Sequence, residues 1–248
     1  MSEYDLYNHA VLAQFYDIEN DWSADFDYCA NMAAESSSVL DLGCGTGMLA
    51  ASLAGAGRLR IVGVDPAEPM LAIARDRRAG EMVRWIQGDA RHIRLDERFD
   101  LVVLTGHAFQ VFLTAADRSA VLRTIAAHLE PDGRFIFDSR NPAAEAWRRW
   151  TPDGSQRVIE LAGLGHVLAW NDASHDARTG IVTYETHYKM LGDGRSYSAL
   201  SRIAFASREE LSSQIGGAGF VVERWMGDWS GADWSPDAPE IIPIGRLR

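Results

Sequence analysis

Three glycines at alternate positions follow a short apolar segment that contains one carboxylate. The segment Val39-Leu40-Asp41-Leu42 is too short for a helix and apolar enough for a buried strand. It runs into Gly43-Cys44-Gly45-Thr46-Gly47, whose glycines admit positive φ angles and let a ligand approach the backbone closely. Residues 48–56 favour a helix, and a helix N-terminus presents free N–H groups and a partial positive charge. Together these features predict a site for a small ligand with a carboxylate or phosphate group.

The spacing of the glycines indicates which ligand this is. The dinucleotide fingerprint is G-x-G-x-x-G, but here the third glycine, Gly47, comes one place early and Met48 holds its position. The loop also lacks the lysine of a phosphate-binding loop. The spacing D-x-G-x-G-x-G, with an acid inside the strand, resembles motif I of the class I S-adenosylmethionine-dependent methyltransferases.

Two acids and a histidine follow the later strands of the chain. Asp65 ends a predicted strand about 20 residues past the glycine loop, where a carboxylate can accept both hydroxyl protons of a ribose. Asp89 follows the next strand, where it can accept a hydrogen bond from the amine of adenine. His107 follows the fourth strand and is the best placed candidate for a general base.

A βαβ pattern must position these residues. We expect strands at 39–42, 60–64, 82–86, 99–105 and 134–138, and helices at 48–56, 68–78 and 114–129. Strands that alternate with helices imply a parallel sheet, whose ligands bind at the carboxyl ends of the strands. Asp65, Asp89 and His107 all fall at such ends.

The segments on either side of this pattern have a different character. Residues 1–37 predict helices over about 5–16 and 23–34, the second with Ser23 as N-cap. Their aromatic side chains fit either a cover packed on the sheet or a lid over the cofactor, with Tyr16 and Trp22 as the lid candidates. Residues 141–206 alternate apolar and polar side chains over 166–170, 181–191 and 196–206, which predicts an inserted antiparallel sheet. A capping box at Ser207 begins a helix, and strands at 220–229 and 240–247 follow.

The composition argues against a nucleic-acid substrate, a metal centre and a membrane-spanning segment. A net charge of −11 argues against a nucleic-acid substrate, because neutralising phosphates requires clustered Lys and Arg. The two cysteines have neither metal nor redox spacing, which favours a reducing cytoplasm and no metal centre. No apolar run approaches the roughly 18 residues of a membrane helix, and the first residues do not resemble a signal peptide. We therefore expect one cytoplasmic domain over residues 1–248 with no membrane partner.

The resemblance to class I methyltransferases rests on motif I and on Asp65, Gly88-Asp89-Ala90, Phe99-Asp100-Leu101-Val102 and Leu129-Glu130-Pro131-Asp132-Gly133. It implies an α/β fold with a Rossmann-like, seven-stranded, mostly parallel sheet of order 3-2-1-4-5-7-6, helices on both faces and the inserted sheet after strand five. It also implies S-adenosylmethionine as the cofactor. The implied cofactor contacts are Asp41, Gly43, Cys44, Gly45, Asp65, Pro66, Met70, Asp89, Ala90, Thr105, Gly106 and the lid residue Trp22.

The implied reaction is an in-line displacement that carries the methyl group to an N or O atom of a small molecule. Alignment and desolvation supply most of the rate, and a general base adds about 10²–10⁴-fold. His107 and Tyr16 are the candidate catalytic residues, although a histidine packed in a loop explains His107 as well. A protein side chain as acceptor, a non-catalytic S-adenosylmethionine-binding protein and a dinucleotide oxidoreductase remain as alternatives. Either a monomer or a homodimer is compatible with the sequence.

Overall fold

The computed structural model of the chain describes residues 5–57, 59–161 and 165–248, and its main feature is a mostly parallel sheet. Its strands are β1 (Ser38–Leu42), β2 (Arg60–Asp65), β3 (Arg84–Gln87), β4 (Phe99–Leu104), β5 (Leu129–Phe137), β11 (Phe220–Met226) and β12 (Glu240–Leu247). They lie in the order β11-β12-β5-β4-β1-β2-β3, and β12 runs antiparallel to both of its neighbours. This is the expected order 3-2-1-4-5-7-6. A two-residue strand, β6 (Ser139–Arg140), continues β5 and pairs with β12.

Helices cover both faces of this sheet. The helices are α3 (Ala24–Ala33), α4 (Met48–Ala56), α5 (Glu68–Asp76), α6 (Ala115–His128) and α8 (Arg208–Gly217). Alternate strand residues face opposite sides, so Leu40 and Val62 pack with α6 and α8 while Val39 and Ile61 pack with α3 and α4. Short 3₁₀ turns lie at Gly80–Met82, Ala108–Val111, Pro142–Ala144 and Ala146–Arg149. No helix within the described residues is long and apolar enough to cross a membrane.

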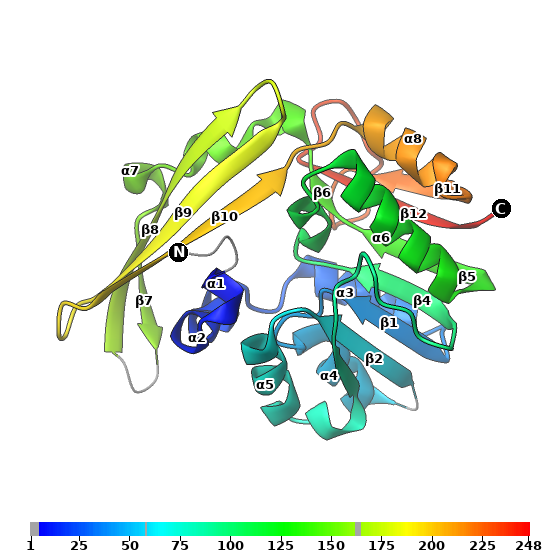
Figure 1. Cartoon of the computed structure of the whole chain (residues 1–248), viewed down its shortest axis with the longest axis horizontal. Helices are drawn as coiled ribbons and strands as arrows, with labels where there is room; N and C mark the ends of the chain where they lie inside the picture. Colours follow the sequence, from blue (N-terminus) through cyan, green and yellow to red (C-terminus); the bar gives the residue numbers. More distant parts are fainter. Residues whose placement is uncertain (1–4, 58, 162–164) are drawn as a thin grey trace.

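A second, fully antiparallel sheet follows strand β5 in the chain. It contains β7 (Arg157–Leu161), β8 (Gly165–Asp176), β9 (Ile181–Met190) and β10 (Ser196–Ala204) in the order β10-β9-β8-β7, and a short helix, α7 (Pro152–Ser155), precedes it. The sequence predicts three of these strands and misses β7. This sheet stands apart from the first, with the N-terminal helices α1 (Asp5–Asn8) and α2 (Ala10–Glu19) between the two (Figure 1).

The helix α2 contacts the second sheet on one side and α5 on the other. Phe15 stacks on Tyr188 of β9 with ring centroids 4.3 Å apart, and Ala13 lies against Met70 of α5. Two expectations for this region need correction. The helix predicted over 5–16 is interrupted at His9, whose extended backbone ends α1 and whose ring accepts a hydrogen bond from Val11 N. Ser23 is the N-cap residue of α3 as expected, but its hydroxyl donates to Asp25 and makes no capping hydrogen bond to the backbone.

A tryptophan fixes the packing behind the glycine loop. Trp85 of β3 donates from Nε1 to the carbonyl oxygen of Gly80 at 2.8 Å, and its ring lies against Gly47 and Gly63. A Cβ on Gly47 would lie 2.4 Å from this ring, and the φ of Gly47 is +74°. Both the space and the backbone conformation therefore require glycine at the start of α4.

We expect Gly47→Ala to lower the free energy of unfolding by roughly 2–5 kcal/mol, because the new methyl group meets Trp85 and the backbone is left-handed. Gly217→Ala is the matched control, since no heavy atom lies within 4 Å of its added Cβ. It should be neutral or stabilise α8 by at most about 1 kcal/mol. Urea unfolding measures both, and equal stabilities would contradict this packing.

The carboxylate inside β1 is nearly inaccessible to solvent. Asp41 is 2% exposed, and burial, with a smaller contribution from Asp65, raises its pKa from 3.8 to about 7. Between these two values the unfolded chain has released the proton and the folded chain retains it. Stability therefore falls as the pH rises from about 4 to about 7.

Asp41→Asn should remove this part of the pH dependence. The free energy of unfolding of the wild type should decline across that window by more than that of the variant, with a difference of a few kcal/mol at about 1.4 kcal/mol per pKa unit. Urea unfolding at a series of pH values measures both slopes. Parallel slopes would show that Asp41 titrates at its ordinary pKa.

Candidate active site

The glycine loop is attached to the end of β2. Gly43 N and Cys44 N donate to the carbonyl oxygen of Val64 at 2.7 and 3.1 Å. One oxygen of the Asp65 carboxylate accepts from Gly45 N at 2.9 Å, and the other accepts from Ala67 N at 2.8 Å. Burial raises the pKa of Asp65, and these two N–H groups oppose that rise. The carboxylate thus joins the loop to the start of α5.

A cavity of about 530 Å³ lies at the carboxyl ends of the parallel strands. Most of the site residues expected from the sequence line it, namely Gly43, Gly45, Asp65, Pro66, Met70, Asp89, Ala90, Thr105, Gly106, His107 and Tyr16. The N-terminal helices and the second sheet complete the wall with Tyr7, Glu19, Arg157, Asn171, Tyr184, Thr186 and Tyr188, among others. On β9, Tyr184 and Tyr188 share the cavity face, because alternate strand residues point to the same side. His187 lies on the other face of that sheet and stacks on Trp170.

Three expected cofactor contacts do not line the cavity. Trp22 is 38% exposed, and its indole N–H donates to Asp27 at 2.8 Å. Asp41 is enclosed within the sheet. The sulfur of Cys44 lies 3.1 Å from the position that a Cβ on Gly63 would take, and burial raises the pKa of this thiol. Trp22 lies outside the cavity wall, just before α3, which packs with α4 on one face of the sheet.

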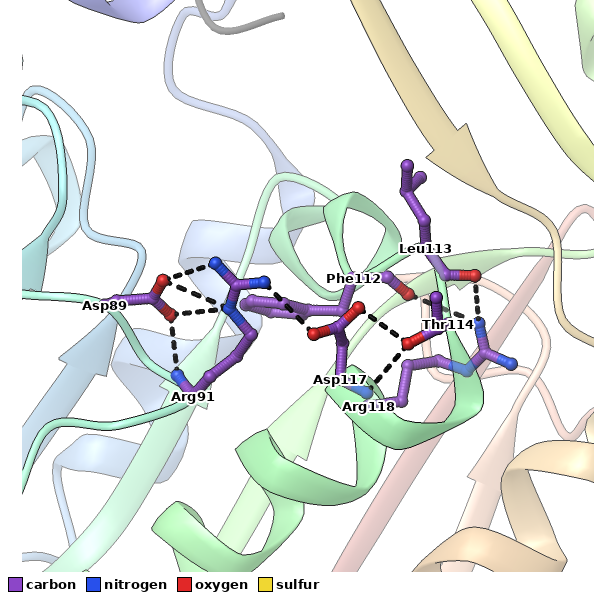
Figure 2. Close-up of polar contacts among 7 residues, drawn as sticks. All are labelled: Asp89, Arg91, Phe112, Leu113, Thr114, Asp117 and Arg118. Carbon is purple, nitrogen blue, oxygen red and sulfur yellow. Dashed lines mark hydrogen bonds and ion pairs between the residues drawn. The ribbon is translucent and has the colours of Figure 1, made fainter.

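Asp89 lies in the cavity wall but already has a partner. It accepts from the backbone N–H of Arg91 at 2.8 Å and pairs with the Arg91 guanidinium at 2.6 Å, which lowers the pKa of Asp89. Arg91 also pairs with Asp117 of α6 at 3.0 Å, so a chain of contacts joins the β3 end to α6 (Figure 2). Arg118 donates to the carbonyl oxygens of Phe112 and Leu113 at 3.2 Å and fixes the loop before α6. The spacing of these residues in the sequence does not indicate this network.

Tyr16 covers the glycine loop from the side of α2. Its ring would lie 3.7 Å from a Cβ on Gly45, and its hydroxyl would lie 3.6 Å from a Cβ on Gly106. Asp17, the next residue, bonds to Thr46 in the loop and to Arg77 beyond α5. Burial raises the pKa of Tyr16 well above its usual range, so the hydroxyl stays protonated. The helix is therefore attached directly to the loop that it covers.

His107 is held by two carboxylates at the end of β4. Its backbone is left-handed, with φ +61°, and its N–H donates to Asp138 Oδ1 at 2.9 Å. Its Nε2 lies 3.1 Å from Glu240 Oε1 and 3.5 Å from Asp138 Oδ2. Asp138 is 1% exposed, and burial raises the pKa of this carboxyl while His107 opposes the rise. The Glu240 acceptor favours the tautomer with its proton on Nε2 and its lone pair on Nδ1. Sequence reasoning identified neither acid.

The chain is similar in sequence to known methyltransferases. Residues 39–133 match a family model described as a methyltransferase domain. The chain is 39% identical over 105 residues to the cypemycin N-terminal methyltransferase of a Streptomyces species, a match that spans only 42% of each protein. It is 30% identical over 203 residues to the dTDP-3-amino-3,6-dideoxy-alpha-D-glucopyranose N,N-dimethyltransferase of Streptomyces fradiae. That alignment covers 79% of this chain and 75% of the relative.

The fold is also similar to that of a known methyltransferase. The CcbJ methyltransferase from Streptomyces caelestis superposes with a TM-score of 0.78 at 22% identity and covers 95% of this chain and 96% of that one. The strand order, the match to the methyltransferase family model and the alignment with the Streptomyces fradiae enzyme all point to the same family. S-adenosylmethionine is therefore the cofactor of this enzyme. The chain belongs to the class I S-adenosylmethionine-dependent methyltransferases, in the group that acts on small molecules.

Proposed function

We propose that the enzyme transfers a methyl group to the amino nitrogen of a small molecule and that His107 removes the proton from that amine. The observation that carries this proposal is the imidazole fixed in the cavity wall by Asp138 and Glu240. The Streptomyces fradiae relative, which aligns along most of the chain and is named as an amino-sugar N,N-dimethyltransferase, supports an amine acceptor.

The cavity has features that suit the cofactor. Glycine at positions 43 and 45 has no Cβ between the backbone and the cavity, so the cofactor can approach the loop closely. The buried Asp65 carboxylate suits a ribose diol. We place the methionine part at Gly43, Thr105 and Gly106, and the adenine at Ala90 beside the Asp89–Arg91 pair. When bound there, S-adenosylmethionine supplies a methyl group that is already activated on a sulfonium.

The protein's own task is to prepare the nitrogen. An aliphatic amine is protonated near neutral pH, and its lone pair is free only after the proton leaves. Nδ1 of His107 accepts that proton, while the hydrogen bond to Glu240 keeps the other proton on Nε2. The charges of Glu240 and Asp138 stabilise the imidazolium that forms. The carboxylates near His107 also attract a cationic acceptor into the cavity.

The remaining segments support this chemistry by closing the site. In this proposal the segment 1–37, of which residues 1–4 lie outside the described residues, acts as a lid on a single domain. Tyr16 places the acceptor against the glycine loop. The second sheet, within residues 141–206, forms the acceptor side of the cavity. The free thiols Cys29 and Cys44 support a reducing cytoplasm as the compartment. We propose a monomer or a homodimer as the assembly.

His107→Gln should lower kcat by about 10²–10⁴-fold, because the general base is lost, and should leave the affinity for S-adenosylhomocysteine unchanged. The pH dependence of kcat should also flatten. The assay is release of S-adenosylhomocysteine with a panel of amines that includes amino sugars. His166→Gln, an exposed histidine on β8, is the control and should behave as the wild type. An unchanged kcat in His107→Gln would remove His107 from the mechanism.

A further inference from the structure

One arginine in the cavity wall has no acidic partner among the residues that the structure describes. Arg140 of β6 is half-buried, and its Nη1 donates to Gln110 Oε1 at 3.0 Å. Its guanidinium lies over the ring of Trp150, 5.1 Å from the centroid. Gln110 is 1% exposed and is itself fixed, because its Nε2 donates to the carbonyl oxygen of Ala204 at 3.0 Å. An amide and an aromatic ring therefore hold this cation in place.

The other arginines of the cavity are neutralised. Arg157 makes a two-pronged pair with Glu19, and Arg91 bonds to Asp89 and Asp117. No carboxylate of the described residues lies within ion-pair distance of Arg140. A fixed cation without a counter-ion is costly in a site from which bound ligand excludes water, so a ligand anion would be stabilised there.

The acid opposite Arg140 in the β6–β12 pair contacts His107 instead. Glu240 of β12 is the cross-strand partner of Arg140, which places their Cβ atoms roughly 4.5–5.5 Å apart. Its carboxylate is turned to His107 at 3.1 Å. Arg140 also follows Asp138 by two residues, which places both on one side of an extended chain. The cation therefore lies beside the residues that hold the general base.

We propose that Arg140 binds an anionic group of the methyl acceptor, a carboxylate or a phosphate. This inference rests on the proposed function, since the acceptor amine would meet His107 while its anionic group meets Arg140. A guanidinium has five N–H donors in one plane, of which Gln110 uses one, and it can bind an oxyanion with two parallel hydrogen bonds. The substrate class is then a small molecule that carries both an amine and an oxyanion a few bonds apart.

A second polar group with an unused acceptor lines the same cavity. Asn171 of β8 lines the wall, and its Oδ1 is buried without a hydrogen-bond partner among the residues that the structure describes. Thr186 is its cross-strand partner on β9 and lines the cavity as well. An unpaired carbonyl oxygen accepts hydrogen bonds only, so it suits a hydroxyl or amine of the acceptor and complements the anion at Arg140.

The test measures anion binding directly and needs no turnover. The full-length protein, saturated with S-adenosylhomocysteine, is titrated calorimetrically with acetate and with inorganic phosphate, against chloride at equal ionic strength. We expect one of the two anions to bind, and Arg140→Gln to weaken its binding by at least about tenfold. Tighter binding of acetate assigns a carboxylate acceptor, and tighter binding of phosphate assigns a phosphate ester.

Two further variants sharpen the result. Arg140→Lys keeps the charge and loses the planar fork, so it should retain part of the affinity. Arg195→Gln removes an exposed arginine in the β9–β10 turn, outside the cavity, and should bind as the wild type does. If neither anion binds the wild type, or if Arg140→Gln binds as tightly as the wild type, the inference is overturned.

The cofactor assignment, on which the proposed function depends, is tested separately in the same series. Each variant is first titrated with S-adenosylhomocysteine alone, whose affinity should not depend on Arg140. If the wild type fails to bind it, the cofactor assignment fails, and anion titration of the free protein still decides whether Arg140 is an anion site.

Discussion

The active site depends on the end of β2, where one carbonyl and one carboxylate hold the glycine loop. Val64 accepts hydrogen bonds from two of the loop N–H groups, and Asp65 accepts one from a third. The position of the loop is therefore fixed by β2, the strand next to β1 in the sheet. The same carboxylate holds the first turn of α5. Because both Asp65 oxygens are engaged and buried, the wall of the cofactor cavity is set before any ligand binds. Such preorganisation suits a reaction whose rate comes mainly from alignment.

The cavity divides by charge. Carboxylates surround His107, whereas Arg140 stands with an amide and an indole and without an acid of its own among the described residues. The β6–β12 pairing brings these two regions together, because Glu240 and Arg140 occupy opposite positions in one short ladder. The site can thus receive a cationic and an anionic group of one small molecule in a defined orientation. The second sheet forms the opposite wall of the cavity.

Much of the cofactor side is local in sequence, and that is why it could be predicted. The glycine loop, Asp65 and the parallel strands follow from strand–loop–helix patterns within short stretches of chain, whereas the order of the strands came from the resemblance to class I methyltransferases. Asp138, Glu240 and Arg140 could not be found in this way. Glu240 lies in a strand whose register against β6 depends on tertiary pairing, so no local pattern places it beside His107. The break at His9 and the partner of Asp89 were missed for the same reason, since local helix and strand patterns do not specify individual side-chain contacts.

The most direct measurement is calorimetric titration of the purified protein with S-adenosylmethionine, S-adenosylhomocysteine and NADH, beside an Asp65→Ala variant. The account predicts that both sulfur compounds bind the wild type, that NADH does not, and that the variant binds the sulfur compounds more weakly. Failure of protein free of carried-over ligand to bind either sulfur compound would contradict the assignment of the glycine loop and Asp65 to this cofactor. NADH binding without them would return the chain to the dinucleotide-binding alternative.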